Sequence, residues 1–264
     1  MSLKNTLLRI LGEARYLRLL CSTFQVLLHR GWLNRSFYRD VYFLERFVRP
    51  GDVCLDIGAH LGYYTFELGR LTRPGGAVYA VEPISKFNSV MEEYLRTHPF
   101  PDVHLLKVAL GGEGPEVEMG IPEVGSRKRF AYAKIIETGD SFHFVETERV
   151  RNEDPNGLFG DLPRIDFIKC DVEGFEVRLF TKMLPTVAKY RPLLLAELNS
   201  VGDRADLARM VQPLGYGCYR LEAGRWEAID PYGSPTFFPH NYYFLTEAHA
   251  QAHAALIRRP GPLA

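Results

Sequence analysis

The chain has 264 residues, of which 46% are hydrophobic and 24% are charged, and its formal net charge at pH 7 is zero. This composition is typical of a globular protein with a substantial core, and the length suits one α/β domain with an extension. Because the charges balance, no broad attraction to nucleic acid is expected, and a nucleic-acid partner is not predicted.

Cysteine usage and hydropathy indicate a compartment. The four cysteines are scattered without a Cys-x-x-Cys pair, and Cys54 and Cys170 lie in apolar runs as small core residues do. A reducing environment, and therefore a cytoplasmic location, is expected. No apolar run approaches the ~20 residues of a membrane span, and basic residues interrupt the N-terminal apolar positions, which argues against a signal peptide.

Residues 1–50 differ from the rest of the chain. Leu3, Leu7 and Leu11 are spaced as on one face of a helix, and Glu13 is the only acidic residue before Asp40 among several lysines and arginines. A basic amphipathic helix can lie on an anionic membrane as a peripheral contact, or can hold a partner. The interpretation that we prefer is an N-terminal helical cap or extension that packs on the sheet or covers the active site.

The run from Val53 to Gly62 is the most informative part of the sequence. An apolar strand, Val53–Ile57, contains Asp56 near its end and leads into a small-residue turn with Gly58, after which a helix begins near Gly62. Strand, glycine turn and helix N-terminus together form a cradle typical of nucleotide sites. The next apolar run ends at Glu82, and a carboxylate at that strand tip can accept both hydroxyls of a ribose.

The turn also indicates which nucleotide-containing cofactor binds. A dinucleotide site would read Gly-x-Gly-x-x-Gly, whereas this turn reads Asp56-x-Gly58-x-x-x-Gly62. The Asp56 carboxylate would repel a pyrophosphate and would attract a cationic amine. S-adenosylmethionine has such an amine, a ribose and no phosphate, and we therefore predict it as the cofactor. The alternative is that any parallel α/β protein has glycines in its first turn.

Strand-like and helical runs alternate along the chain. The predicted strands are nearly all apolar, as expected for a parallel sheet covered on both faces; they are Val53–Ile57, Ala77–Glu82, Val103–Leu110, Ile165–Asp171 and Leu193–Leu198. Helices are predicted near Gly62, Ser85, Gly174 and Asp203, with Ser85 and Asp203 as N-caps. The runs Tyr216–Glu222, Trp226–Ile229 and Tyr242–Leu245 predict antiparallel strands at the C-terminal end of the sheet. The result is a seven-stranded, mostly parallel open sheet with helices on both faces, within a domain over residues 51–247 that is followed by a tail at 248–264.

Residues 121–163 interrupt the alternation as an insertion. It includes the strand-like run Phe142–Val150 and three consecutive basic residues, Arg127, Lys128 and Arg129. An insertion at this point would overhang the carboxyl ends of the strands, where such segments often select the substrate. The three basic side chains could bind an anionic substrate, although a run of charges in a loop is more often solvated.

The run from Ile165 to Glu176 carries a second group of charged residues. A buried strand ends with Lys169, Asp171 and Glu173, and Gly174 then leads into a helix. Lys169 and Asp171 point to the same side of the strand, so they can pair. Placed beside the Asp56 turn, the three side chains would meet the reactive end of the cofactor, and we predict them as catalytic residues.

Four motifs in this order resemble the FkbM-type S-adenosylmethionine-dependent methyltransferases. They are Asp56-Ile-Gly58-Ala59-His60-Leu-Gly62-Tyr63-Tyr64-Thr65, Val81-Glu82-Pro83, Val108-Ala109-Leu110, and Ile168-Lys169-Cys-Asp171-Val-Glu173-Gly174. The resemblance implies a class I methyltransferase (Rossmann-like) fold and methyl transfer to a hydroxyl oxygen on a sugar, glycan or secondary metabolite. The cofactor-binding residues that it implies are Asp56, Gly58, Ala59, His60, Gly62, Tyr63, Thr65, Glu82, Pro83, Val108, Ala109 and Asp171.

Two departures from the family pattern bear on the site. His60 stands where the family usually has asparagine, and an imidazole can still donate a hydrogen bond to the cofactor or can change the site. The family also tends to carry a Leu-Asp pair before the fourth strand, where this chain reads Val150-Arg151-Asn152-Glu153-Asp154.

A hydroxyl acceptor must lose its proton, either to a base or through a metal. The candidate bases are Asp171, Glu173 and, with less support, His143 and His240. Asp171, Glu197 and Asn199 lie at the tips of neighbouring predicted strands, and their oxygens suit Mg²⁺. The alternative is that Glu197 and Asn199 only bind substrate or cap the next helix.

Two other classes of protein fit parts of the sequence. A non-catalytic protein could have kept the cofactor fold, although the charged residues of both motifs are intact. A nicotinamide-dependent oxidoreductase is disfavoured by the missing glycine pattern and by Asp56 at the turn.

Overall fold

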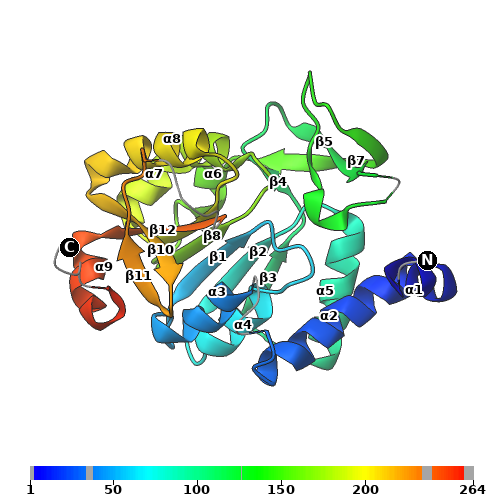
Figure 1. Cartoon of the computed structure of the whole chain (residues 1–264), viewed down its shortest axis with the longest axis horizontal. Helices are drawn as coiled ribbons and strands as arrows, with labels where there is room; N and C mark the ends of the chain where they lie inside the picture. The colour runs from blue at the N-terminus through cyan, green and yellow to red at the C-terminus, as the bar shows by residue number, and fades with distance from the viewer. Residues whose placement is uncertain (1–2, 34–37, 126, 234–239, 259–264) are drawn as a thin grey trace.

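The computed structural model describes residues 3–33, 38–125, 127–233 and 240–258. Its centre is an eight-stranded sheet in the order β11-β10-β12-β9-β8-β1-β2-β3 (Figure 1). The strands are β1 Val53–Ile57, β2 Ala77–Val81, β3 Val103–Leu106, β8 Phe167–Cys170, β9 Leu193–Glu197, β10 Tyr216–Glu222, β11 Arg225–Ala228 and β12 Asn241–Thr246. Strands β3, β2, β1, β8 and β9 are parallel, whereas β12, β10 and β11 pair antiparallel, as predicted. The sheet has eight strands rather than the predicted seven, because all eight strand-like runs contribute a strand to it, with Arg225–Ala228 as the edge strand β11.

Helices cover both faces of this sheet (Figure 1). One face carries α6 Pro155–Phe159, α7 Glu176–Tyr190 and α8 Val201–Val211, the last followed by the 3-10 turn η3 Gln212–Leu214. The other face carries α3 Arg39–Phe43, η1 Leu44–Arg46 and α4 Thr65–Leu71, and α5 Ser85–Thr97 follows β2. The fold is therefore α/β with a mostly parallel central sheet.

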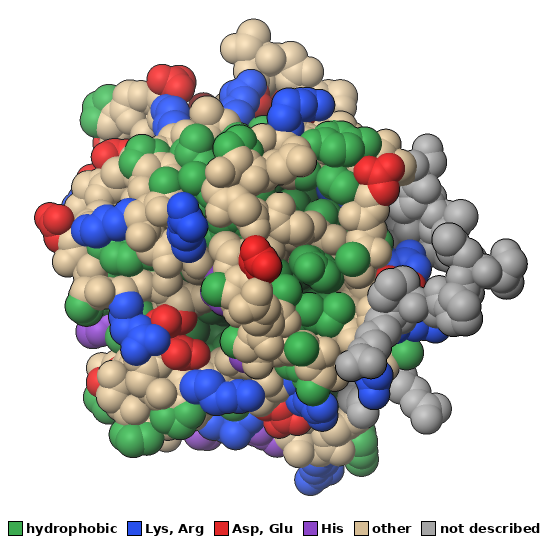
Figure 2. All heavy atoms as spheres, turned by 90° about the vertical axis from the view of Figure 1, so that its left-hand side faces the viewer, with side chains coloured by type: hydrophobic (Ala, Val, Ile, Leu, Met, Phe, Trp, Pro, Cys, Tyr) green, Lys and Arg blue, Asp and Glu red, His purple; other side chains and the backbone are tan. Residues whose placement is uncertain are grey.

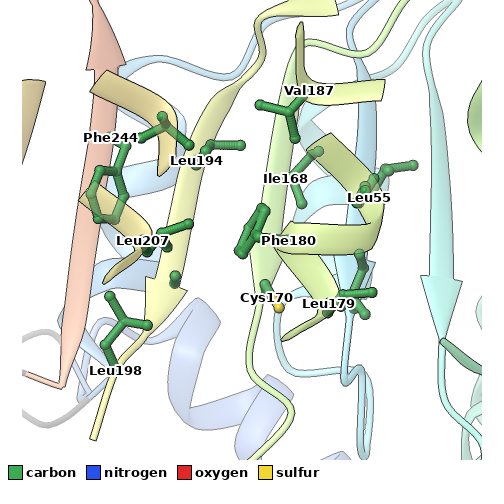
Figure 3. Packing of buried hydrophobic residues seen from close by; sticks show 14 of the residues in the cluster. Leu55, Ile168, Cys170, Leu179, Phe180, Val187, Leu194, Leu198, Leu207 and Phe244 are labelled. Carbon is green, nitrogen blue, oxygen red and sulfur yellow. The ribbon is translucent and has the colours of Figure 1, made fainter. Parts of the chain in front are cut away.

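Alternation along the central strands sends side chains into two separate cores. Leu55, Ile168 and Leu194 project toward α7 and α8, where they meet Phe180 and Leu207 (Figure 3). The intervening residues of the same strands pack on the opposite face; they include Cys54, Phe167 and Leu195, with Phe47 and Trp226. Both faces are covered, which explains why these strands are apolar at almost every position.

Two predicted helix caps are wrong. Helix α5 begins at Ser85 with Ile84 as its N-cap, and no side chain caps it. Helix α8 begins at Val201, and its N-cap is Ser200, whose hydroxyl accepts a hydrogen bond from the Asp203 amide at 3.0 Å. Asp203 is thus the third residue of the helix, where its carboxylate interacts favourably with the positive end of the helix dipole.

A second, four-stranded sheet stands over one end of the first (Figure 1). Its order is β4-β7-β5-β6, and the strands are β4 Ala109–Leu110, β5 Glu116–Glu123, β6 Lys134–Ile135 and β7 His143–Glu153, with a 3-10 turn, η2, at Phe130–Tyr132. The predicted strand Val103–Leu110 is therefore two strands in two sheets. We call residues 109–153 the flap.

The N-terminal segment is helical, with α1 at Leu3–Leu11 and α2 at Glu13–His29. Tyr16, Leu17 and Cys21 of α2 are buried in the cluster that also contains residues of α5 and of the flap. Glu13 forms ion pairs with Lys86 of α5 and Lys128 of the flap. The inner face of α2 thus packs on α5 and the flap, and contact of its outer face with a membrane stays a prediction.

The chain beyond the sheet forms α9 Glu247–Ala252 and η4 Ala254–Leu256. On the side of the molecule that carries α9 and β11, basic and acidic side chains are interspersed (Figure 2). No helix within the described ranges is long and apolar enough to cross a bilayer.

Candidate functional site

A cavity of about 910 Å³ opens at the carboxyl ends of β1, β2, β8 and β9, beneath the flap. Strand-end residues form its floor, and the flap adds Phe130, Tyr132 and Phe142. This is the edge of a parallel α/β sheet at which ligands bind. The sequence placed the site here because both charged motifs follow the ends of buried strands.

Asp56 and Lys169 form the charged centre beneath the cavity. They are register partners in the parallel strands β1 and β8, so their side chains leave the sheet on the same face. Lys169 Nζ lies 3.6 Å from Asp56 Oδ1 and 3.4 Å from Asp171 Oδ2, and it donates a hydrogen bond of 2.9 Å to the Gly58 carbonyl. The predicted pairing of Lys169 with Asp171 is therefore present.

Burial and neighbouring charges shift both pKa values. Burial lowers the pKa of Lys169, but Asp171 and Asp56 outweigh it and raise that pKa above its ordinary value. Burial raises the pKa of Asp56, although Lys169 and a 2.5 Å hydrogen bond donated by the Thr65 hydroxyl oppose the rise. Lys169 thus stays charged and links the ends of β1 and β8.

Glu82 holds the turn after β1 against the end of β2. Its Oε2 accepts a hydrogen bond of 2.9 Å from the His60 amide, and its Oε1 accepts one of 2.8 Å from the Ile84 amide. Burial raises its pKa to about 8. Each carboxylate oxygen has a second lone pair, so the group can still accept ribose hydroxyls, whose hydrogen bonds would favour its ionised form.

The glycine turn brings two strand ends into backbone contact. Gly58 has φ of +78°, and a Cβ built on it would lie 1.7 Å from the Asp171 carbonyl oxygen. His60 also has a positive φ, of 52°, a conformation in which asparagine and histidine are enriched among non-glycine residues. Its ring packs against Phe87 with centroids 4.4 Å apart.

The His60 imidazole is neutral at physiological pH. Burial lowers its pKa to about 4, and its Nε2 has no hydrogen-bond partner among the described residues. The ring lines the cavity. A buried nitrogen without a partner is unfavourable, so this atom fits a hydrogen-bonding group on a ligand.

Three carboxyl groups gather at the tips of β8 and β9. Asp171, Glu173 and Glu197 all line the cavity. Burial, followed by repulsion from Asp171, raises the pKa of Glu173 to about 9 and that of Glu197 to about 8. Asp171 and Glu197 are close enough for their charges to interact. A cationic ligand would stabilise the ionised forms of these groups.

The structure brings most of the predicted site residues to this cavity. Those that line it are Gly58, Ala59, His60, Tyr63, Glu82, Pro83, Val108, Ala109, Lys169, Asp171, Glu173, Glu197, Asn199 and the candidate base His240. Asp56, Gly62 and Thr65 lie behind the wall instead. Asp56 and Thr65 are fully buried and bond to each other, so they support the turn rather than contact a ligand directly.

Sequence reasoning missed several residues of the wall. Tyr38 comes from the N-terminal segment, and its ring meets Tyr63 edge-on with centroids 5.7 Å apart. The Lys169 ammonium lies 5.3 Å from the ring centroid of Tyr64, which also lines the cavity. Tyr64 belongs to the first motif, so its position was a usable signal. The N-terminal cap was expected to pack on the sheet or cover the site, but no local pattern singled out Tyr38.

A cluster of three acidic, histidine or cysteine ligands does not accompany the predicted Mg²⁺ site among the described residues. Across the described part of the chain, no group of three His, Cys, Asp or Glu side chains could hold a metal ion. Asp171 and Glu197 do lie together, and Asn199 lines the same cavity.

The sheet order, the glycine turn and the acidic strand tips define the protein as a class I methyltransferase by fold. The family model of the methyltransferase FkbM domain matches residues 56–221, and the chain belongs to that family. Membership indicates S-adenosylmethionine-dependent methyl transfer.

Three individual proteins show how far the likeness extends. A methyltransferase FkbM from Methylobacillus flagellatus has a TM-score of 0.50 at 15% identity, covering 91% of this chain and 57% of that one, which supports the fold alone. A protein-L-isoaspartate O-methyltransferase from Aeropyrum pernix is 38% identical over 66 residues, or 25% of each chain, so the match spans a quarter of that curated relative. Fibrillarin from Aeropyrum pernix, a structure with natively bound S-adenosyl-L-methionine, has a TM-score of 0.41 at 10% identity, covering 75% of this chain and 67% of that one.

The cavity fits S-adenosylmethionine. The carboxyl groups of Asp171, Glu173 and Glu197 suit its positive charges, and the free Nε2 of His60 suits a polar group. Ile57, Val108, Ala109 and Leu110 give an apolar wall for an adenine ring.

Proposed function

We propose that this protein transfers a methyl group from S-adenosylmethionine to a hydroxyl oxygen of a sugar, glycan or secondary metabolite. The observation that carries the proposal is the group of three carboxyl side chains, Asp171, Glu173 and Glu197, on the cavity wall. Lys169 forms an ion pair with Asp171 in this group. Such an acidic end suits the positive charges of the donor. A phosphate-bearing nicotinamide cofactor would be repelled there, which disfavours an oxidoreductase.

S-adenosylmethionine, when bound, supplies an electrophilic methyl group. The protein must hold the acceptor oxygen in line with that group, because alignment at near contact can contribute much of the rate. The turn from Gly58 to His60 and the Lys169 ammonium fix the two strand ends relative to each other. A shift of either end would misalign donor and acceptor.

The acceptor proton needs a base whose pKa lies near the working pH. We assign this role to Asp171 and Glu197, which line the cavity together; burial and repulsion from Asp171 raise the pKa of Glu197 to about 8. Glu173 has a pKa of about 9 when no cationic ligand lies beside it, so it holds its proton at neutral pH until the donor binds and is a poorer candidate for the base.

The same geometry leaves a role for Mg²⁺, which takes few protein ligands and keeps several waters. Asp171, Glu197 and Asn199 are the residues that would hold it, and the ion would lower the pKa of a bound hydroxyl. Unchanged turnover after exhaustive chelation would rule out the mechanism that depends on Mg²⁺.

The test of the proposed function is methyl transfer from radiolabelled S-adenosylmethionine to a panel of sugar and metabolite hydroxyls. Asp171→Asn and Glu197→Gln should each lower kcat by about 10²- to 10⁴-fold, the range for loss of a general base. Glu173→Gln is the matched control, because glutamine resembles the protonated acid, and it should cost much less. Cofactor binding without turnover of any acceptor would instead support a non-catalytic binding protein.

A further inference from the structure

Arg129 is a cation of the flap to which the described residues supply no counter-charge at the cavity. Arg129 lines the cavity from the flap side. Its backbone is fixed, because its amide donates a hydrogen bond of 2.9 Å to the Pro122 carbonyl and its carbonyl accepts one of 3.1 Å from the Tyr132 amide. The guanidinium carbon lies 5.9 Å from the centroid of the Tyr132 ring. The residue is thus held at the cavity wall by β5 and η2.

The neighbouring cations already have partners. Lys128 and Lys86 both pair with Glu13 and Glu146, so that two positive and two negative charges balance. Lys134, which also lines the cavity, lies 2.8 Å from Asp140. These carboxylates are therefore engaged and do not compensate the charge of Arg129.

Arg129 itself has no ion pair, and its buried Nε has no hydrogen-bond partner, within the described part of the chain. A buried donor without a partner costs free energy, and native proteins usually satisfy such groups. A guanidinium presents a planar fork that matches the geometry of a carboxylate or a phosphate. The arrangement is therefore suited to an anion that enters the cavity.

The two ends of the cavity differ in charge. The strand tips carry Asp171, Glu173 and Glu197, which suit the positive charges of the donor. Arg129 lies on the flap instead, beside the Tyr132 ring, and the aromatic side chains of Phe130 and Phe142 line the same cavity. An apolar ring face beside a cation is suited to a sugar or other ring that carries an acidic substituent.

We propose that Arg129 anchors the methyl acceptor through a carboxylate or phosphate group, so that the substrate is an acidic hydroxy compound such as a uronic acid or a sugar phosphate. The inference rests on the proposed function, since it assigns the acceptor of the same site. Arg129 acts here as a specificity-determining residue and takes no part in proton transfer.

The test uses probes matched in shape and different in charge. The protein loaded with S-adenosylhomocysteine is titrated with glucose, glucuronic acid and glucose 6-phosphate, and binding is followed by calorimetry and by thermal shift. We expect the two acidic probes to bind and glucose to bind at least tenfold more weakly. Arg129→Ala should weaken the acidic probes by about ten- to hundredfold, the range for a hydrogen bond to a charged group.

Two variants sharpen the result. Arg127→Ala removes an exposed arginine of the same loop and should change nothing. Arg129→Lys keeps the charge without the planar fork and should lie between wild type and Arg129→Ala. Binding of the acidic probes that is equal in Arg129→Ala and wild type, or no binding of either acidic probe to the wild type, would overturn the inference.

The affinity for S-adenosylhomocysteine separates the two proposals. If Arg129→Ala weakens the binding of S-adenosylhomocysteine as much as that of the acidic probes, Arg129 binds the carboxylate of the cofactor. The acceptor assignment is then wrong. If the wild type binds the acidic probes but not S-adenosylhomocysteine, the proposed methyl transfer fails while the anion site stands.

Discussion

Replacement of Lys169 by methionine should strongly destabilise the protein. The Lys169 side chain is 7% exposed and Asp56 is fully buried, and the ammonium lies 3.6 Å from the Asp56 carboxylate and 3.4 Å from that of Asp171. Removing one partner of a buried ion pair leaves an uncompensated charge, which typically costs about 3–5 kcal/mol. The loss of the hydrogen bond to the Gly58 carbonyl adds to this cost.

Urea unfolding followed by tryptophan fluorescence measures the effect, because Trp226 is buried in the core. The double variant Lys169→Met/Asp56→Asn removes the stranded charge and should recover a large part of the lost free energy of unfolding. The loss in Lys169→Met should also shrink as the pH falls, since a raised pKa lets Asp56 take up a proton. A loss below about 1 kcal/mol in Lys169→Met, or losses that simply add in the double variant, would refute the reasoning.

Three further predictions concern the site. Glu82→Gln should weaken S-adenosylhomocysteine binding at least about tenfold, because an amide NH₂ would face a backbone N–H that now donates to the carboxylate; calorimetry checks this, with the exposed Glu45→Gln as control. His60→Asn should fold with a loss of about 0.5–1.5 kcal/mol, because asparagine tolerates the positive φ but the ring contact with Phe87 is lost; a loss of 4 kcal/mol or more in urea would contradict this. The free energy of unfolding should fall as the pH rises from 5 to 9, and Glu173→Gln should flatten that curve.

The sign of the pH prediction follows from the direction of the pKa shift. The pKa of Glu173 is about 9 in the folded protein against an ordinary value of 4.5, so between these values the folded state binds more protons than the unfolded state. Stability then decreases with rising pH. Measured unfolding free energies that stay level or rise over this range would show that the carboxyl cluster is less buried than the structure indicates.

Much of the site could be predicted because its determinants are local in the sequence. Asp56 and Lys169 each follow an apolar run, and parallel strands bring their carboxyl ends to one edge of the sheet. The pairing of Lys169 with Asp171 required only the two-residue period of a strand.

The remainder depends on contacts between distant segments. Nothing in the sequence shows that the Thr65 hydroxyl bonds to Asp56 and keeps that carboxylate behind the cavity wall. The insertion at residues 121–163 was expected to overhang the site, but the second sheet runs from Ala109 to Glu153. The split of Val103–Leu110 between two sheets follows from the pairing of Ala109 with Asn152, far along the chain. The ion pairs that balance Lys128, and that leave Arg129 without a charge partner among the described residues, also join segments remote in sequence.

The most direct test of the central claim is calorimetric titration of the purified protein with S-adenosylmethionine and S-adenosylhomocysteine, in wild type and in Glu82→Ala. The account predicts micromolar binding of both ligands by the wild type and a large loss in the variant, with Glu45→Ala unchanged. A folded wild-type protein that binds neither ligand, with or without Mg²⁺, would contradict it.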